Sequence, residues 1–444
     1  MLDILRQQLH DDFVTGAKWC VALSGGVDST ALLHAIVKLG KELPGNTIRA
    51  IHVNHHLHAD ADTWASACQS LCDELDVPFI CCDVTVATAA SDGVEAAARK
   101  ARYGALTGLL GDGEILLTAH HRDDQVETLL LRLLRGAGPH GLASIESRRT
   151  CGRGWLVRPL LDVGRGALET YAREQKLEWI EDPANNDTAF DRNFLRHRVL
   201  PVLRERWPGL GETLPRAVRL SAEASRMLDE LAELDLSGTG NGAGPDDALP
   251  IAVLEQLSSA RQRNLVRYWL RRRGLTPPAE AKLRDGLRQL LTAGPDRMPM
   301  VKWGDVQMRR YRDRLYVLEF DPEPANSVRP DARDWDGRGR IDFGPPRGSL
   351  RFVSGDATDI DAPLSWVVRF RAGGERIAVG VQHKTVKNFF QERGVVPWMR
   401  AHIPLLYRAD RLVAIGDLWQ AEDLGCEGVR DDITVVWDDH PIAL

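Results

Sequence analysis

Short apolar runs alternate with longer helical stretches between residues 17 and 135. The apolar runs are rich in Val, Ile, Leu and Ala, which is typical of strands buried on both faces. They predict strands at residues 19–23, 48–53, 79–86 and 114–119. The intervening stretches repeat apolar residues with a helical period and predict helices at residues 29–40, 60–76, 93–110 and 122–135. This alternation predicts an α/β fold with a Rossmann-like parallel sheet.

The rest of the chain consists of helical segments and a smaller mixed domain, separated by linkers. Helical periods return at residues 165–176, 191–206, 214–236 and 251–292. Strand-like stretches follow near residues 299–319. The glycine-rich run at 237–245 predicts one linker, and a segment rich in Pro, Asp, Arg and Gly at 321–346 predicts another. We therefore predict a catalytic domain, a mainly helical domain and a small α+β C-terminal domain, at residues 1–215, 216–320 and 347–444.

Length and composition fit a folded protein of two or three domains. The chain has 444 residues, of which 43% are hydrophobic and 27% charged. No apolar stretch approaches the ~20 residues that cross a bilayer, and the first residues lack the pattern of a signal peptide. The seven cysteines lack disulfide spacing, and Cys20, Cys81 and Cys82 lie in strand-like runs. We therefore expect reduced core thiols and a cytoplasmic protein.

Arginines gather in three blocks although the formal net charge is −6. The blocks cover residues 192–206, 261–273 and 309–314. One such block alone is typical of a solvated helix face, whereas three in an acidic protein favour a polyanionic partner such as nucleic acid. Tyr268 and Trp269 lie inside the second block and are candidates for stacking on bases.

Residues 24–29 read Ser-Gly-Gly-Val-Asp-Ser and lie where the first predicted strand turns into a helix. Glycines let the backbone approach an anion closely, and the free amides at the start of a helix bind phosphate. Ser24 and Ser29 add hydroxyl donors, and Asp28 is suited to hold a magnesium ion on the phosphates. No lysine follows the glycines, so this is not the G-x-x-x-x-G-K-[ST] loop, whose lysine reaches the β- and γ-phosphates. The hexapeptide resembles the pyrophosphate-binding loop of enzymes that cleave ATP between its α- and β-phosphates.

A polar cluster follows the fourth predicted strand. Residues 118–128 read Thr-Ala-His-His-Arg-Asp-Asp-Gln-Val-Glu-Thr, and on a helix Asp123 and Glu127 share one face. Carboxylates at the carboxyl edge of a parallel sheet serve a metal, a cationic substrate or proton transfer. The alternative interpretation is that these acidic residues form a solvated first turn, which the helix dipole favours. This alternative is strongest for Asp124.

Two other residue pairs are less specific. His120 and His121 are candidate zinc ligands, but no Cys/His set of suitable spacing accompanies them. Glu95 and Arg99 are four residues apart on a predicted helix, where a surface ion pair is the ordinary interpretation. These pairs become specific for a function only in combination with the other motifs.

The motifs occur in a fixed order along nearly the whole chain. They are Ser-Gly-Gly-Val-Asp-Ser at 24–29, His-Val-Asn-His at 52–55, Glu-Ala-Ala-Ala-Arg at 95–99, the cluster at 118–128, Glu-Asp-Pro-Ala-Asn-Asn-Asp at 181–187, Gly-Gly-Glu-Arg at 373–376 and Lys-Thr-Val-Lys-Asn-Phe-Phe at 384–390. This series resembles the bacterial tRNA(Ile)-lysidine synthetases. One departure is residues 56–60, His-Leu-His-Ala-Asp, where that family more often has a Gly-Leu-Arg-Pro-like stretch. No role is therefore assigned to His56 or His58.

The resemblance implies an N-terminal domain with an adenine nucleotide α-hydrolase-like fold and a reaction in two steps. ATP first adenylates the C2 oxygen of the wobble cytosine in a tRNA(Ile) with a CAU anticodon, releasing pyrophosphate. The side-chain amine of free L-lysine then attacks C2, and AMP leaves to give lysidine. ATP and Mg²⁺ would be the cofactors, tRNA(Ile) and L-lysine the partners, and no membrane would be involved. The sequence leaves open whether the chain forms a homodimer.

The resemblance also implies roles for individual residues. The ATP-binding residues would be Ser24, Gly25, Gly26, Val27, Asp28 and Ser29 in the loop, and His52, Val53 and Asn54 around the adenine. Asp28 would hold the metal, and Arg99 would bind the lysine carboxylate or a phosphate. The amine of lysine has a pKa of ~10.4 and must lose a proton, for which Glu127 is the first candidate base and Asp123 the second. The tRNA backbone would contact Arg192, Arg196, Arg267, Arg271 and Arg272.

Two other functions remain alternatives at this point. A tRNA 2-thiolation enzyme has the same kind of loop, but its cytidine-thiolating members carry paired C-x-x-C cysteines, and this chain has none. A nucleotide-gated RNA-binding protein without catalysis would keep the glycine loop and the arginine blocks. It would not need Asp28, Asp123 and Glu127 together, so the combination favours an enzyme.

Overall fold

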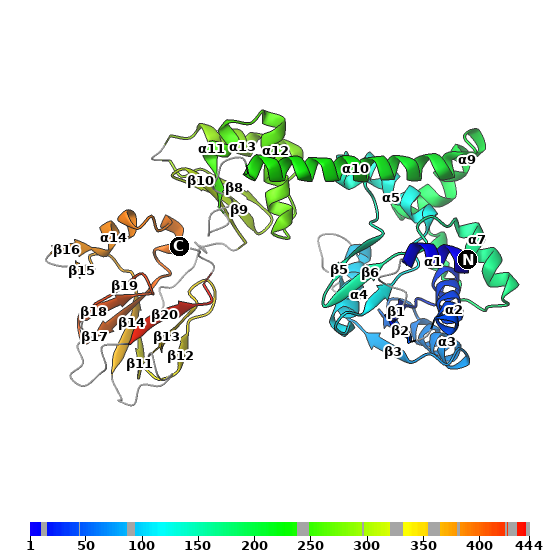
Figure 1. The fold of residues 1–444 in the computed structure, drawn as a ribbon, viewed down its shortest axis with the longest axis horizontal. Coiled ribbons are helices and arrows are strands. Elements are labelled where there is room, and N and C mark those ends of the chain that lie inside the picture. Colours follow the sequence, from blue (N-terminus) through cyan, green and yellow to red (C-terminus); the bar gives the residue numbers. More distant parts are fainter. Residues whose placement is uncertain are drawn as a thin grey trace. The chain divides into compact units, whose positions relative to one another are not determined.

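The computed structural model describes residues 1–9, 16–43, 45–86, 94–237, 248–294, 297–319, 332–353, 365–379, 382–421, 424 and 433–440. The chain forms two compact units, Met1–Met227 and Leu228–Leu444 (Figure 1). The glycine loop and the polar cluster at 118–128 both lie in the first unit.

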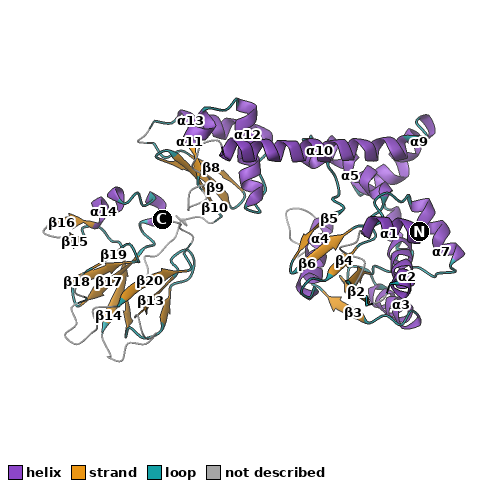
Figure 2. Cartoon of the chain, in the orientation of Figure 1, coloured by secondary structure: helices purple, strands orange, loops and turns teal. Residues whose placement is uncertain are grey.

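A six-stranded sheet forms the centre of the first unit, with strand order β3-β2-β1-β4-β6-β5. The strands are β1 (Lys18–Ala22), β2 (Thr47–Asn54), β3 (Phe79–Asp83), β4 (Ile115–Leu117), β5 (Arg148–Cys151) and β6 (Gly154–Val157). Of these strands only β5 runs antiparallel to its neighbour. Figure 2 shows the strands in orange, with the helices in purple around them. The predicted parallel α/β sheet is confirmed.

Helices cover both faces of this sheet. They are α1 (Leu2–Leu9), α2 (Val27–Glu42), α3 (Ala61–Glu74), α4 (Val94–Leu109), α5 (Arg122–Leu134), α6 (Pro139–Leu142), α7 (Arg165–Glu174), α8 (Asp191–Phe194) and α9 (Leu200–Arg206), with a π-helical turn at Leu195–Val199 between α8 and α9. Side chains alternate along a strand, so Trp19 and Val21 pack with α1, α2, α3 and α7, whereas Cys20 packs with α4 on the other face.

The strand order creates a crevice at one edge of the sheet. The chain moves outward from β1 through β2 to β3, and then returns to place β4 on the other side of β1. Loops that leave β1 and β4 at their carboxyl ends therefore diverge, which is where ligands bind in such sheets. The loop at 24–29 follows β1, and His120 and His121 follow β4.

Sequence analysis did not predict the β5–β6 hairpin. β5 carries Arg148 and Arg149, which give no apolar signal, and β6 is only four residues long. Short strands of this kind lack a period that separates them from loops. The sheet therefore extends further beyond β4 than the pattern indicated.

The second unit begins within α10 (Leu210–Ser237) and contains helices on a four-stranded antiparallel sheet. Its elements are β7 (Leu249–Pro250), α11 (Ile251–Glu255), α12 (Ser259–Arg272), α13 (Glu280–Thr292), β8 (Met300–Trp303), β9 (Val306–Tyr311) and β10 (Arg314–Leu318). These elements agree with the helical segment predicted at 251–292 and the strands predicted near 299–319. Trp269 is 1% exposed and packs in the core of this unit with Leu265 and Leu270. The expectation that Trp269 stacks on bases is wrong, because it lies on the apolar face of α12.

The end of the chain is built mainly from antiparallel strands. They are β11 (Arg333–Trp335), β12 (Arg340–Asp342), β13 (Ser349–Val353), β14 (Trp366–Phe370), β15 (Arg376–Val379), β16 (Gln382–Thr385), β17 (Pro404–Arg408), β18 (Arg411–Ile415), β19 (Trp419–Gln420) and β20 (Thr434–Asp438). The described residues here also form one α-helix, α14 (Val386–Glu392), and a short 3-10 helix at Pro397–Met399. The predicted linker at 321–346 is wrong in its second part, because β11 and β12 form there and Trp335 stacks on Phe352. The glycines in this stretch belong to turns between short strands. Residues 320–331, and most of the linker predicted at 237–245, lie outside the described residues.

The cysteines divide according to the position of their strands. Cys20 is buried, but Cys81 is exposed and Cys82 is half-buried, because β3 is the edge strand of the sheet. The expectation of core thiols is thus correct for Cys20 and wrong for Cys81. Among the described residues, no helix is both long and apolar enough to cross a membrane.

Candidate active site

The loop at residues 24–29 forms a tight turn between β1 and α2. Gly25 has a φ of +83°, a conformation that side chains rarely adopt. Its carbonyl accepts a 2.9 Å hydrogen bond from the Ile180 amide. The Oγ atoms of Ser24 and Ser29 lie 3.0 Å apart, and Ser29 Oγ also accepts from the Ser24 amide at 3.1 Å. The turn is therefore held in one shape before any ligand binds.

The start of α2 provides an anion-binding position. The helix begins at Val27, and its N-cap residue, Gly26, has no side chain to pair with the first helical amides. These amides and the positive end of the helix dipole attract a negative group. The arrangement suits the phosphates of a nucleotide.

Asp28 lies in the first turn of α2 and faces the end of β4. Its Oδ2 atom is 3.5 Å from His121 Nε2, whereas its Oδ1 atom is buried and has no hydrogen-bond partner. An unpartnered carboxylate oxygen beside a phosphate position fits a bound Mg²⁺. In the described part of the chain, no group of three His, Cys, Asp or Glu side chains is arranged to hold a metal. Phosphate oxygens and water would supply the other ligands.

His121 connects the glycine loop to the acidic helix α5. The imidazole is 2% exposed and lies 3.5 Å from Asp28, 3.8 Å from Asp123 and 3.6 Å from Asp124. Burial alone lowers the pKa of His121, but the contact with Asp28 and the charges of Asp124 and Asp123 outweigh it and raise this pKa. The three neighbouring carboxylates therefore favour the protonated form of the ring, which balances part of their negative charge.

Glu127 is buried in an ion-pair network with two arginines. It is 1% exposed, and its Oε2 atom accepts hydrogen bonds of 2.7 Å from Arg192 Nε and 2.9 Å from Arg196 Nη2. Its Oε1 atom accepts a third, of 2.6 Å, from Arg196 Nε. Arg192 also binds Asp124, whose Oδ2 accepts from the His121 amide at 2.9 Å. Both oxygens of the first candidate base are thus occupied by guanidinium groups.

Asp124 is therefore not the solvated first-turn residue that its sequence position allowed. Burial raises its pKa, but the charges of His121 and Arg192 outweigh this effect and lower the pKa below its ordinary value. Asp124 stays ionised and holds the start of α5 to the network.

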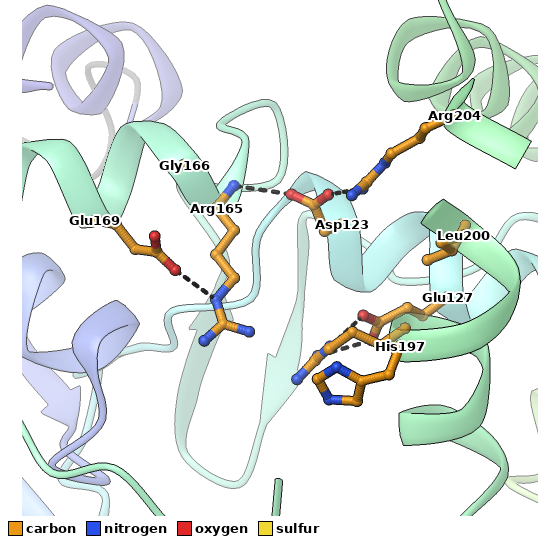
Figure 3. Close-up of a pocket in the computed structure, with 9 residues that line it drawn as sticks. Asp123, Glu127, Arg165, Gly166, Glu169, His197, Leu200 and Arg204 are labelled. Carbon is orange, nitrogen blue, oxygen red and sulfur yellow. Dashed lines mark hydrogen bonds and ion pairs between the residues drawn. The ribbon is translucent and has the colours of Figure 1, made fainter. Parts of the chain in front are cut away.

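Asp123 lines an open pocket of about 280 Å³ beside this network (Figure 3). One of its oxygens accepts a 2.8 Å hydrogen bond from the Arg165 amide at the start of α7, and the other pairs with Arg204 of α9. Burial raises the pKa of Asp123, but the hydrogen bond from the Arg165 amide and the charge of Arg204 outweigh this effect and lower the pKa below its ordinary value. The other charged residues that line the pocket are Glu127, Arg165, Glu169 and Arg196. The pocket thus offers carboxylates and guanidinium groups side by side, which suits a zwitterionic amino acid.

The residues proposed for the adenine lie at the carboxyl end of β2. His52 is buried, and its Nδ1 atom is 2.9 Å from the carbonyl of Leu23, the residue that follows β1. The Asn54 side chain donates to Asp62 at 2.9 Å and accepts from the His56 amide at 3.0 Å. These bonds occupy the Asn54 amide, which leaves backbone groups of this strand end to contact a base.

Arg99 lies on α4, which packs on the opposite face of the sheet from α7. It is exposed, and its guanidinium carbon lies 5.2 Å from the centre of the Tyr103 ring. The side chain of Glu95, its expected ion-pair partner, lies outside the described part of the structure. Arg99 also contributes to the positive field around His120.

The structure brings Asp28, Asp123 and Glu127 together with Arg192 and Arg196 in the first unit. By contrast, Arg267, Arg271 and Arg272 lie on α12 in the second unit, where Arg267 pairs with Glu280 and Arg271 with Asp229. From the sequence, His121 was only a candidate zinc ligand, Asp124 was assigned to a solvated first turn and Arg204 to an arginine block, and Arg165 was not singled out. The i, i+3 spacing of His121 and Asp124 was an available signal, whereas Arg165 and Arg204 meet Asp123 only through tertiary folding.

The sheet order and the glycine loop after β1 define a PP-loop enzyme of the ATP-pyrophosphatase class. In agreement, a family model for the PP-loop domain matches residues 3–203. Models for the TilS substrate binding domain and the TilS substrate C-terminal domain match residues 249–316 and 366–437. None of the matched ranges ends at a predicted domain boundary, so the boundaries at residues 215, 216, 320 and 347 stay predictions.

Curated relatives extend this similarity over nearly the whole chain. The tRNA(Ile)-lysidine synthase of Alkalilimnicola ehrlichii is 44% identical over 91% of this chain and 90% of its own. The enzymes of that name from Pseudomonas putida and Methylococcus capsulatus are 42% and 38% identical, over 90% and 98% of this chain and 92% and 99% of theirs. Among solved structures, the U34-tRNA thiolase NcsA from Methanococcus maripaludis aligns with 17% identity and a TM-score of 0.43, over 50% of this chain and 77% of that chain. The chain belongs to the tRNA(Ile)-lysidine synthase family, which confirms the resemblance seen in its motifs.

We predict that Gly25→Ala distorts the loop and weakens ATP binding at least about tenfold. The substituted Cβ would lie 2.4 Å from Ile180 Cδ1, and φ at this position is +83°. The strain should cost ~1–3 kcal/mol of stability. Gly26→Ala is the matched control for stability, because its Cβ would meet nothing closer than Ser24 Oγ at 3.8 Å. Calorimetric ATP titration and thermal melts measure both effects, and equal melting temperatures for the two variants would contradict the prediction.

We predict that neutral His120 makes the first unit less stable in mild acid. Burial, together with Arg158, Arg99 and Arg102, lowers its pKa from 6.5 to about 3, against an opposing effect of Asp124. Between these two pH values the unfolded chain takes up a proton that the folded chain does not, so stability falls as pH falls from ~6.5 towards ~3. His120→Gln should lose less stability than wild type between pH 8 and pH 5. Urea unfolding at both pH values measures this, and an equal loss in both proteins would refute it.

Proposed function

We propose that the chain forms lysidine at the wobble cytidine of a tRNA(Ile) with a CAU anticodon, using ATP and free L-lysine. AMP and pyrophosphate are the other products. The observation that carries the proposal is the contact of His121 with both Asp28 of the glycine loop and Asp123 of the pocket. This contact places a position for ATP phosphates directly beside a position for an amino acid. Cytoplasmic tRNA is the expected substrate pool.

In the first step, the loop at 24–29 and the first amides of α2 bind the β- and γ-phosphates that leave as pyrophosphate. The amides and hydroxyls stabilise the charge that develops on the leaving group. Asp28 would hold Mg²⁺, which supplies charge neutralisation on the phosphates when it is bound. The C2 oxygen of the cytosine attacks the α-phosphate, so AMP becomes attached to the base and pyrophosphate departs.

In the second step, the lysine side-chain amine loses a proton and attacks C2, and AMP leaves. The pocket beside Asp123 would bind the amino acid, with guanidinium groups on its carboxylate and carboxylates on its ammonium groups. Glu127 remains the first candidate base and Asp123 the second. Arg192 and Arg196 occupy Glu127 in the free protein. RNA phosphates that attract these two arginines would free the carboxylate for proton transfer at the moment the tRNA is in place.

The second unit would bind the body of the tRNA through α12. The guanidinium groups of Arg267 and Arg271 are held by Glu280 and Asp229. Partly exposed ion pairs of this kind contribute little to stability and exchange readily for phosphate contacts. Arg272 extends the same helix. A separate module of this kind allows the enzyme to distinguish two tRNAs that share the CAU anticodon, because RNA is read through shape and backbone away from the target base.

The direct test incubates purified protein with an unmodified tRNA(Ile) transcript, ATP and isotope-labelled lysine. Mass spectrometry of the digested nucleosides should show the label on one cytidine, with AMP and pyrophosphate in solution. Omission of lysine should stop formation of the modified nucleoside. Release of ADP, or modification that continues without lysine, would refute the proposed function.

We further predict that two acidic substitutions stop the reaction at different steps. Asp28→Ala should reduce adenylation by at least about 100-fold, because charge neutralisation at the leaving group is lost. Glu127→Gln should slow lysine transfer by ~10²–10⁴-fold and let adenylated tRNA accumulate. Glu74→Gln, an exposed residue of α3, is the matched control and should react like wild type. Trapping of the adenylated tRNA with Asp28→Ala but not with Glu127→Gln would reverse the assignment.

A further inference from the structure

Arg158 is a buried cation at the carboxyl end of β6. Its side chain is 6% exposed, and its Nη1 atom donates to the Glu146 carbonyl at 2.5 Å. Its Nε atom is buried and has no hydrogen-bond partner. A guanidinium group that is removed from water without full pairing is costly, and an anion offsets this cost. Neither the mechanism proposed above nor the PP-loop uses this residue.

Arg149 lies on β5, where the Ser147 carbonyl just before this strand accepts a 2.8 Å hydrogen bond from the Arg158 amide, and Arg99 and Arg102 lie on α4. The ring of Tyr103 on α4 has the guanidinium carbons of Arg99, Arg102 and Arg149 at 5.2, 5.7 and 5.7 Å from its centre. The Oη atom of Tyr103 is buried and, like Arg158 Nε, has no hydrogen-bond partner. The cluster thus contains two buried donors without an acceptor.

Three of these arginines also act electrostatically on His120, which follows β4. Burial, together with the charges of Arg158, Arg99 and Arg102, lowers the pKa of His120 to about 3 against the charge of Asp124. Asp124 itself is already bound to Arg192. Among carboxylates whose side chains the structure describes, none forms an ion pair of 4.0 Å or less with Arg149 or Arg158. The carboxyl ends of β4 and β6 therefore carry a local excess of positive charge.

We propose that Arg158, Arg149, Arg102 and Arg99, with the Tyr103 hydroxyl, form a binding site for a backbone phosphodiester of the RNA next to the target cytidine. The site rests on the proposed function, since it positions the same substrate. Arg149 is exposed and Arg158 is buried, so the cluster leads from the surface to the edge of the sheet beside His120. Guanidinium groups match phosphate oxygens in pairs, and phosphate contacts fix the register of the bases.

The position of the cluster favours an RNA phosphate over a phosphate of ATP. The triphosphate already has the amides and hydroxyls of the loop after β1 and the carboxylate of Asp28. Arg149 lies on β5 and Arg158 directly follows β6, and β4 separates both of these strands from β1. Tyr103 also offers an aromatic ring among the arginines, which suits a nucleotide unit of a polymer.

The test measures binding of a CAU anticodon stem–loop RNA to the full-length protein over a range of salt concentrations. Arg149→Ala and Arg158→Gln should each weaken binding about tenfold, as expected for loss of a charge-assisted hydrogen bond. Each should also reduce the slope of log affinity against log salt by roughly 0.7–0.9. Arg158→Lys should retain the wild-type slope, and thermal melts show whether Arg158→Gln is folded. Arg149 is exposed, so its substitution tests the site without a change in the core.

Arg153→Ala is the matched control. Arg153 lies in the turn of the same β5–β6 hairpin, at the opposite edge of the sheet from Arg158, and pairs with Asp112 at 3.4 Å. This variant should bind the RNA with wild-type affinity and slope. ATP affinity should be unchanged in all variants, and weaker ATP binding with normal RNA binding would assign the arginines to the nucleotide and overturn the proposal.

A second arm identifies the phosphate itself. The stem–loop is synthesised with an uncharged methylphosphonate on either side of the target cytidine. Wild type should bind one of these two RNAs about tenfold more weakly than the unmodified stem–loop. Arg149→Ala should bind that RNA and the unmodified stem–loop with equal affinity, because the variant already lacks the partner of the missing charge. If the loss of affinity from Arg149→Ala and the loss from the methylphosphonate add up for both RNAs, the proposed site is refuted. If wild type forms lysidine but the variants keep the wild-type slope, only the phosphate site fails, whereas absence of lysidine in wild type refutes the proposed function.

Discussion

The buried imidazole of His121 is the contact on which the geometry of the site depends. It follows β4 and touches Asp28 of the loop that follows β1, as well as Asp123 and Asp124 of α5. Three carboxylates repel one another at this distance in a poorly solvated place, and they raise the pKa of the His121 ring, whose proton reduces that repulsion when it is bound. The parallel sheet makes the contact inevitable, since β1 and β4 are neighbours and end at the same edge.

A second layer of positive charge surrounds the carboxylates. Arg192, Arg196 and Arg204 come from the helical segment after α7, and each binds a carboxylate of α5. These pairs bring charges that are expensive to bury and that are stabilised only while each has its partner. Arg196 lies in a π-helical turn, a local irregularity that often occurs at functional sites. The network therefore holds α5 in place. Its arginines are also groups that a polyanion can bind in place of the carboxylates.

Much of the fold could be predicted from the pattern of residues, and the failures have identifiable causes. The four predicted strands and the helices between them were found because each has a continuous apolar run or a helical period. The β5–β6 hairpin, β11 and β12 were not found, because strands of three or four residues carry too little pattern to differ from loops. Cys81 and Trp269 were placed wrongly for a related reason. Whether an apolar strand is central or at the edge, and which face of a helix is covered, depends on neighbours that are distant in sequence.

The sequence by itself determined the class of chemistry, because the glycine loop must lie between a strand and a helix and the acidic motif must follow another strand. Its motifs also indicated the family, which the comparisons established. Only the tertiary structure decided how the charged residues pair. Glu127 and Arg196 are far apart along the chain, yet they share hydrogen bonds, and Arg158 is buried beside other arginines although its sequence position gives no sign of this. Side-chain pairing and burial are set by which elements pack together, and that is a property of the whole fold and not of any local stretch of sequence.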